Sequence, residues 1–285
     1  MANFVPTPRD LLGLVVRGFA MGLVEVLPGI SGGTIALLTG IYDRLVTALS
    51  DLTMWTKNLF KKRDFDLVEL SRSLVVIAPL AMGMIVGFGV SVLSVSHVLE
   101  TRPMLVWGAV FGLVAGAVIF TGLSSKVRIL VMFAPVGFAF ALLFNLLPGR
   151  EADASLIVVF VGAVLAFGAW ILPGISGSFV LLVLGVWTTM VQAFASVDLL
   201  VILVFLAGLK TGFLVFSHPI RVLLDKYRDA LMAVFCGLLA GSLWRIWPWN
   251  SSQVEPSSVF VVVLVMCSSF LVICVLTYAK KHKET

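Results

Sequence analysis

Two copies of the hexapeptide Leu-Pro-Gly-Ile-Ser-Gly decide the fold of this chain, one at Leu27–Gly32 and the other at Leu172–Gly177. Each copy interrupts a long apolar stretch, 11–49 in the first half and 156–197 in the second. Proline removes a backbone hydrogen-bond donor and glycine permits turn conformations closed to other residues, so each hexapeptide predicts a break between two helical arms. The sequence therefore predicts two broken or re-entrant helical hairpins.

The composition around these motifs is that of a membrane protein. Of 285 residues, 60% are hydrophobic and 12% are charged, and the mean hydropathy is +1.11. A soluble domain has about 25% charged residues and under about 50% apolar ones. This excludes a soluble enzyme, a nucleic-acid-binding protein and a disordered chain, and predicts an all-α polytopic membrane protein. Cysteine spacing indicates no disulfide framework, metal site or cofactor; the residues are Cys236, Cys267 and Cys274.

Both hexapeptides belong to an internal duplication. Three further residues recur 145 positions later: Leu37, Gly40 and Val46 reappear as Leu182, Gly185 and Val191. Four glycines recur 125 positions later: Gly83, Gly87, Gly112 and Gly116 reappear as Gly208, Gly212, Gly237 and Gly241. Apolar spans near the ~20 residues that cross a bilayer follow each hairpin, at 74–99, 104–123, 129–147, 199–216, 230–247 and 258–278. We therefore predict two repeats, 1–150 and 151–285, each a hairpin plus three transmembrane helices.

The distribution of charge predicts the orientation, because excess Lys and Arg marks cytoplasmic loops. Basic residues gather at 57–72, around Lys126, at 218–229 and in the C-terminal tail, while the loop at 150–153 leans acidic. Corresponding loops of the two halves then fall on opposite sides of the membrane. This predicts an inverted-topology repeat, as in many secondary transporters, with both termini cytoplasmic and each hairpin beginning and ending on one side.

The residues around the two breaks favour an anion. Serine and threonine hydroxyls lie beside each turn, and the helix after each turn would point free N–H groups at it, which suits phosphate or carboxylate. Two such tips facing each other near the midplane would form a small symmetric site; alternatively, each turn only packs two helices together. The candidate substrate-binding residues are Pro28, Gly29, Ser31, Gly32, Gly33 and Thr34 in the first turn and Pro173, Gly174, Ser176, Gly177 and Ser178 in the second.

Three charged residues inside apolar stretches are further candidates, because a charge at the bilayer centre costs ~2.5–3.5 kcal/mol. Arg17 either offers its guanidinium to phosphate oxygens or snorkels to the cytoplasmic face. Glu25 either carries a coupled proton, competes with a bound anion or balances a basic residue. Lys210 is a weaker headgroup candidate. No residue is predicted to be catalytic.

Several of these segments together resemble a known family. The stretch Gly22-Leu-Val-Glu-Val-Leu-Pro-Gly-Ile-Ser-Gly-Gly-Thr34 resembles the first signature of the bacterial polyprenyl-phosphate translocases, long classed as a membrane domain of unknown function. The stretches 171–178 and 241–249 resemble its later signatures. The resemblance implies a flippase of the bacterial cytoplasmic membrane that returns undecaprenyl phosphate from the outer to the inner leaflet for envelope synthesis. Many members are expected to have Asp or Asn at the position of Glu25.

Two other functions remain open at this stage. Undecaprenyl-pyrophosphate phosphatases are also inverted repeats with an acidic residue near a Pro-x-Ser turn, but Gly32 and Gly177 stand here where their signature places arginine. Without that arginine the turn lacks a group to stabilise phosphoryl transfer. A secondary transporter of a small soluble anion, or of another lipid, also fits the repeat. A coupling proton or ion is an open partner in each case. The sequence does not indicate an oligomeric state.

Overall fold

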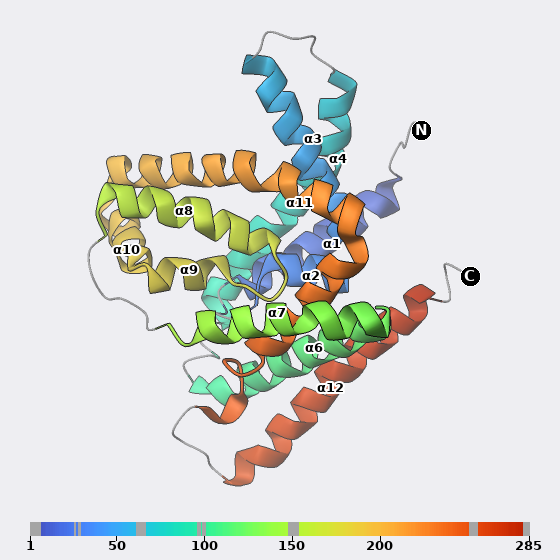
Figure 1. Cartoon of the computed structure of the whole chain (residues 1–285). Coiled ribbons are helices and arrows are strands. Elements are labelled where there is room, and N and C mark those ends of the chain that lie inside the picture. The colour runs from blue at the N-terminus through green and yellow to red at the C-terminus, as the bar shows by residue number, and fades with distance from the viewer. Residues whose placement is uncertain are drawn as a thin grey trace.

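The chain is seen here in a computed structural model that describes residues 7–25, 27, 30–60, 67–95, 98, 101–147, 154–250 and 256–281. All regular elements in these ranges are helical, as expected from the composition (Figure 1). The first half contains α1 (Pro8–Val24), α2 (Gly32–Leu38), α3 (Tyr42–Phe60), α4 (Leu67–Val90), the π-helical η1 (Ser91–Val95), α6 (Pro103–Leu123) and α7 (Val127–Asn145). The second half contains α8 (Leu156–Ile171), α9 (Gly177–Val183), α10 (Val186–Ser196), α11 (Leu199–Ser242), the 3₁₀ turn η2 (Pro248–Asn250) and α12 (Pro256–Lys281).

Among the described residues, four helical segments are long and apolar enough to cross a membrane: Leu70–Ser94, Pro103–Leu123, Val127–Asn145 and Leu199–Ser242. Helices α9 and α10 together pass the same test but are bent by 99°, which makes a fifth candidate. Shorter apolar helices occupy Leu156–Ile171 and Val259–Val275. The expectation of a polytopic helical membrane protein is therefore confirmed.

Helix α11 differs from the two spans joined by a linker that the sequence predicted. It runs for 44 residues, and its backbone leaves helical geometry only at Tyr227, with φ −130° and ψ 37°. The helix bends there, so its first part (199–226, hereafter α11a) and last part (228–242, hereafter α11b) run in different directions (Figure 1). The charged linker continues the helix, and within it Arg221 and Asp225 form an i,i+4 pair, 2.8 Å apart.

Each hairpin has a second break that was not predicted. Helices α2 and α9, which follow the hexapeptides, have only seven residues each. Both end at a glycine with left-handed backbone geometry, Gly40 at φ 72° and Gly185 at φ 73°. Only glycine adopts this conformation without strain, so the chain turns again before α3 and α10. Equivalent glycines thus produce equivalent second breaks.

Glycines let α1 cross α4, and α8 cross α11a, at equivalent places. A Cβ atom built at Gly83 would lie 2.1 Å from the carbonyl oxygen of Val15, and one at Gly208 would lie 2.5 Å from that of Phe160. Gly208 follows Gly83 by 125 residues and Phe160 follows Val15 by 145, the two offsets of the duplication. Small residues allow backbones to approach closely in membrane helix pairs, so the duplicated glycines mark duplicated helix crossings.

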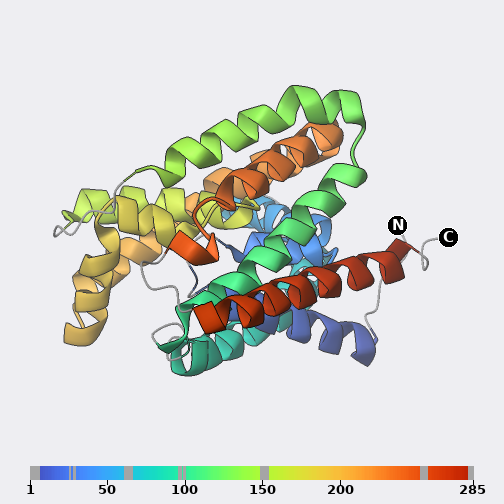
Figure 2. The same ribbon diagram turned by 90° about the horizontal axis from the view of Figure 1, so that it is seen from below.

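The remaining helices pair across the two halves of the chain. A Cβ atom built at Gly112 of α6 would lie 2.2 Å from the carbonyl oxygen of Met266 in α12. One built at Gly237 of α11b would lie 1.9 Å from that of Ala134 in α7. Figure 2 shows both pairs, α6 beside α12 and α7 beside the last part of α11. Each half therefore contributes one helix to a pair completed by the other half, which ties the halves into one bundle.

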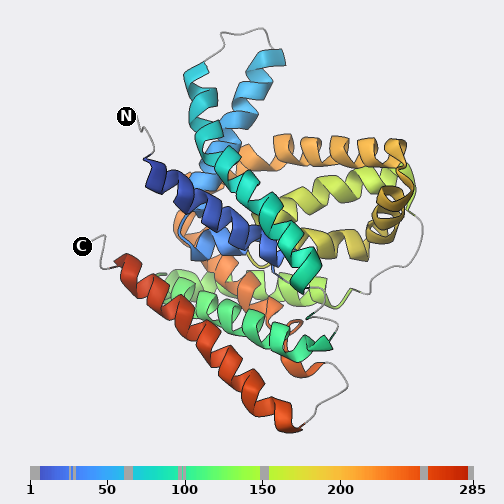
Figure 3. The same ribbon diagram turned by 180° about the vertical axis from the view of Figure 1, so that it is seen from behind.

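The hairpins approach each other from opposite ends of the molecule. Helix α1 begins at the end where α12 finishes, whereas α8 begins at the opposite end, and both run towards the middle (Figures 1 and 3). The turns that follow α1 and α8 consequently lie near the centre of the bundle.

Candidate functional site

The two hairpin tips are in direct contact. The hydroxyl of Ser31 donates a hydrogen bond to the carbonyl oxygen of Leu172 over 3.4 Å. The backbone N–H of Gly174 donates to the hydroxyl oxygen of Thr34 over 3.1 Å. These bonds join residues some 140 positions apart in the sequence, so the two turns lie face to face.

Gly33 sets how closely the tips approach. A Cβ atom built there would lie 2.7 Å from the carbonyl oxygens of both Trp170 and Ile171. Those oxygens belong to backbone and cannot move aside as a flexible side chain does. A side chain at position 33 would therefore force the tips apart.

The serines at the tips cap the short helices that follow them. Ser31 Oγ accepts from the backbone N–H of Thr34, and Ser176 Oγ accepts from that of Phe179, each over 3.4 Å. The hydroxyls of Ser176 and Ser178 lie 2.8 Å apart. Ser31, Thr34 and Ser176 are buried, whereas Ser178 is half-buried. Of the hydroxyls predicted to receive an anion, three are thus buried where the tips meet, and that of Ser178 is more exposed.

Glu25 lies between the tips and accepts two hydrogen bonds at one oxygen. Its Oε1 is 3.0 Å from the backbone nitrogen of Gly32 and 2.7 Å from the indole nitrogen of Trp170. Trp170 stands 145 residues after Glu25, which is one of the two offsets of the duplication. The hydrogen bond between them therefore joins equivalent positions of the two halves. No ion pair of Glu25 with a Lys or Arg occurs within the described ranges. The carboxyl group of Glu25 is thus held by N–H donors of both hairpins.

Among the described residues, the remaining glycines and the proline predicted at the tips pack closely against neighbouring groups. A Cβ atom built at Gly32 would lie 2.8 Å from Glu25 Oε1, and one at Gly177 would lie 2.7 Å from the carbonyl oxygen of Ala166. Gly174 has φ +88° and packs against the backbone of α11b. Pro173 is buried beside it. Pro28 and Gly29 lie outside the described residues.

The structure does not bring Arg17 or Lys210 to the tips. The guanidinium of Arg17 is directed towards the start of α1, since its Nη1 is 3.2 Å from a Cβ atom built at Gly13. This is the direction that snorkelling to the membrane surface requires. Lys210 is exposed on α11a.

Two residues near the tips were missed in the sequence. Tryptophans were interpreted only as an interfacial belt, so Trp170 went unnoticed, although the offset of 145 that equates it with Glu25 was a usable signal. Arg245 was also missed: its Cζ lies 4.0 Å from the ring centre of Phe179, in the first turn of α9. Its Nη1 lies 3.5 Å from the carbonyl oxygen of Asn145. Arg245 lies within the stretch 241–249 that resembles a family signature, but only its contacts with Phe179 and Asn145 show where its side chain lies.

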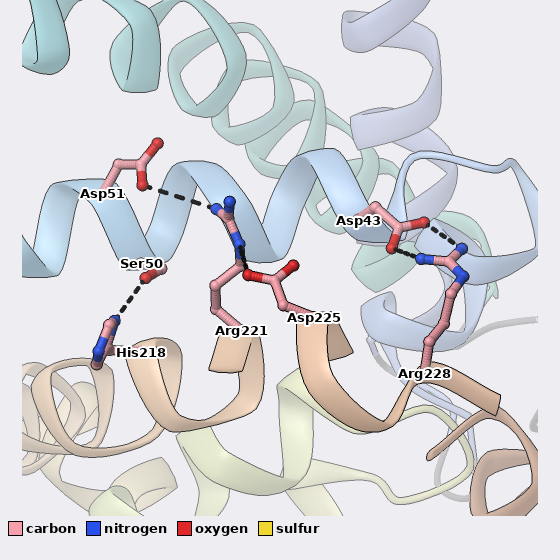
Figure 4. Close-up of polar contacts among 7 residues, drawn as sticks. All are labelled: Asp43, Ser50, Asp51, His218, Arg221, Asp225 and Arg228. Atoms are coloured by element: carbon pink, nitrogen blue, oxygen red, sulfur yellow. Dashed lines mark hydrogen bonds and ion pairs between the residues drawn. The ribbon is translucent and has the colours of Figure 1, made fainter. Parts of the chain in front are cut away.

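A separate group of charges joins α3 to α11 (Figure 4). Arg228 forms two hydrogen bonds with Asp43, and Arg221 lies 3.7 Å from Asp51. His218 Nδ1 is 3.1 Å from the hydroxyl of Ser50. Partial burial raises the pKa of Asp51, and the charge of Arg221 acts in the opposite direction. These ion pairs lie at the segment 218–229 that the sequence assigned to the cytoplasmic side, and no tip residue takes part in them.

Comparison with known proteins identifies the family. Residues 21–277 match the family described as undecaprenyl phosphate translocase-like. The chain belongs to this family. It is 32% identical over 245 residues to a polyprenyl-phosphate transporter of Vibrio cholerae, covering 85% of this chain and 80% of the relative. It is 29% identical over 275 residues to a polyprenyl-phosphate transporter of Staphylococcus aureus, covering 88% and 92%.

The family match covers the whole tip region and confirms the resemblance seen in the sequence. Both hexapeptides, Glu25, Trp170 and Arg245 fall inside residues 21–277, whereas Arg17 precedes them. No solved structure matches the chain. The contacts between the tips therefore lie within the part of the chain that matches the translocase-like family.

Proposed function

We propose that this chain is a flippase that moves undecaprenyl phosphate from the outer to the inner leaflet of the bacterial cytoplasmic membrane, and that it is a transporter rather than an enzyme. Family membership supports the lipid substrate, as do two relatives named polyprenyl-phosphate transporter. The observation that carries the proposal is the meeting of two broken turns, one from each half, inside a membrane bundle. Inward movement recycles the lipid carrier for envelope synthesis.

We also propose that the halves, 1–150 and 151–285, form an inverted repeat with six full spans. The equivalent glycine contacts support this, and so does the bend at Tyr227, which divides α11 into two spans. The six spans are then α4, α6, α7, α11a, α11b and α12. Helix α1 begins where α12 ends, which agrees with both termini lying on the cytoplasmic side.

The proposed substrate site is the contact between the tips. A phosphate monoester needs only a few N–H and O–H donors, while its isoprenoid tail stays in lipid. Ser31, Thr34, Ser176 and Ser178 supply hydroxyls, and the carboxylate of Glu25 marks where N–H donors of both hairpins converge. Two anions repel each other in this low-dielectric setting, so phosphate displaces the carboxylate or binds when it is protonated. In the second case, Glu25 links lipid movement to a proton.

The first experiment measures movement of labelled lipids by the purified protein in proteoliposomes. We expect rapid transfer of undecaprenyl phosphate between leaflets, slower transfer of the pyrophosphate and no acceleration for the neutral alcohol, because the site is built for one phosphate. Release of inorganic phosphate from the pyrophosphate would instead indicate a phosphatase. Uptake of free phosphate with no lipid movement would indicate a small-anion transporter.

A double variant, Ser31→Ala with Ser176→Ala, tests the tips. Each serine caps a helix, and loss of such a cap costs about 1 kcal/mol. With the donors to phosphate also removed, we expect the transfer rate to fall about tenfold, since ~1.4 kcal/mol corresponds to a factor of ten. Ser196→Ala, an exposed serine bonded only to its own helix, is the control. An unchanged transfer rate in the double variant would show that the tips are not part of the substrate site.

A further inference from the structure

Arg245 is a half-buried cation that has no carboxylate partner in the part of the chain that the structure describes. By contrast, Lys126, Arg221 and Arg228 each pair with an aspartate. A charged side chain inside a membrane protein is costly and usually marks a binding site or pathway. We therefore expect Arg245 to bind an anionic ligand, and the residues around it indicate the chemical class of that ligand.

Two contacts among the described residues orient the guanidinium plane of Arg245, and they engage few of its N–H donors. The face of the guanidinium lies on Phe179, 4.0 Å from the ring centre, and this contact engages no N–H group. Among the described residues, one long bond of 3.5 Å runs from Nη1 to the carbonyl oxygen of Asn145. A guanidinium has five N–H donors in a planar fork that matches two phosphate oxygens. An oriented fork of this kind is suited to a phosphate monoester.

The position of Arg245 places that fork beside the second tip. Phe179 is in the first turn of α9, and its backbone N–H is capped by Ser176. The adjacent Ser178 is half-buried and hydrogen-bonds to Ser176. In the proposed topology α11b runs outward, so Arg245 lies at the outer side, next to the exposed Trp244.

The two halves differ in charge at this point. The residue 125 positions before Arg245 is Phe120, so the first half lacks the corresponding cation. The first tip holds the carboxylate of Glu25, while the position equivalent to Glu25 in the second half is Trp170. One tip thus has a nearby cation and the other an internal anion. The two tips have equivalent backbones, but among the described residues only the second has a cation beside it. This difference favours capture of an anion at the second tip.

We propose that Arg245 is the outer capture residue for the lipid phosphate. Its guanidinium receives the phosphate monoester headgroup from the outer leaflet and passes it to the hydroxyls of Ser178 and Ser176. This inference rests on the proposed flippase function and deepens it by naming the residue and the side at which the headgroup is first bound.

The test compares binding of a short-chain polyprenyl phosphate with binding of the matching neutral alcohol, using the full-length protein in nanodiscs. Arg245→Met keeps the apolar contact with Phe179 but removes the charge, and Arg245→Lys keeps a charge without the fork. We expect Arg245→Met to weaken phosphate binding by about tenfold or more, since hydrogen bonds to charged groups contribute that much. Arg245→Lys should be intermediate, and alcohol binding and Tm should stay unchanged. Arg102→Ala, an exposed arginine at the start of α6, is the matched control.

The outcomes separate this inference from the proposed function. Wild-type phosphate affinity in Arg245→Met would overturn the role of Arg245 alone. Equal losses of phosphate and alcohol binding, or a lowered Tm, would also overturn it, because they would show that Arg245 only packs against Phe179. If the unaltered protein itself fails to distinguish phosphate from alcohol, the proposed flippase function fails instead.

Discussion

Gly33→Ala is expected to abolish most lipid transfer while the protein still inserts and folds. The added Cβ atom would lie 2.7 Å from two backbone oxygens of the opposite tip, at Trp170 and Ile171. Overpacking of this kind costs about 1–3 kcal/mol, whereas Gly→Ala within a helix is worth only ~0.5–1 kcal/mol in the opposite direction. The cost of the steric clash therefore exceeds the gain in helix stability, and we expect the two tips to separate. The measurement is the rate of undecaprenyl phosphate transfer in proteoliposomes, which should fall by up to about 60-fold, because a net cost of up to ~2.5 kcal/mol converts at ~1.4 kcal/mol per factor of ten.

Gly89→Ala is the matched control for this substitution. Gly89 is also a helical glycine, but a Cβ atom built there meets nothing within 4 Å. We expect wild-type transfer and a slightly raised Tm, because alanine is the better helix former. Wild-type transfer by Gly33→Ala as well would mean that close contact of the tips is not required for transport.

Trp170→Phe is expected to reduce transfer by about tenfold or more through Glu25, because a hydrogen bond to a charged group is worth ~1.5–3 kcal/mol. The phenyl ring keeps an aromatic side chain but loses the N–H that lies 2.7 Å from Glu25 Oε1. The carboxylate then keeps the bond from the backbone of Gly32 and no longer links the two tips. The readouts are the transfer rate and its dependence on pH.

A double-mutant cycle with Glu25→Gln shows whether the two side chains act together. If they do, the double variant is no slower than the more impaired single variant, and the coupling energy is about 0.5–3 kcal/mol. Trp187→Phe, an exposed tryptophan of α10, controls for loss of an indole in general. Additive effects in the cycle would show that Trp170 and Glu25 contribute independently.

These results would together describe a site whose two tips share a backbone design and differ in charge. Glu25 occupies donors at the contact between the tips, while Arg245 lies beside the second tip with most of its donors unused. Under the proposed function, a phosphate captured near Arg245 meets the carboxyl group of Glu25 before it crosses.

The repeats and the breaks were predictable from the sequence because they depend on local chemistry. The Pro-Gly pairs at 27–32 and 172–177 favour a break in the helix, and scarce charge excludes a water-exposed surface. The sequence showed Gly83 and Gly208 as members of the duplication, and in the folded chain both lie against a backbone. The second breaks at Gly40 and Gly185 were not anticipated, because a glycine shows its need for positive φ only in the folded chain.

The partners of each side chain were decided by the tertiary structure. Arg17 and Arg245 are both arginines in apolar surroundings, and sequence reasoning selected the first. The fold directs Arg17 back towards Gly13 and places Arg245 over Phe179, since helix packing sets where a long side chain can reach. Likewise, the bond between Glu25 and Trp170 exists only because the tips meet. The sequence alone determined the membrane bundle, its duplication and the two turns, while long-range packing determined which donors and charges face each other across them.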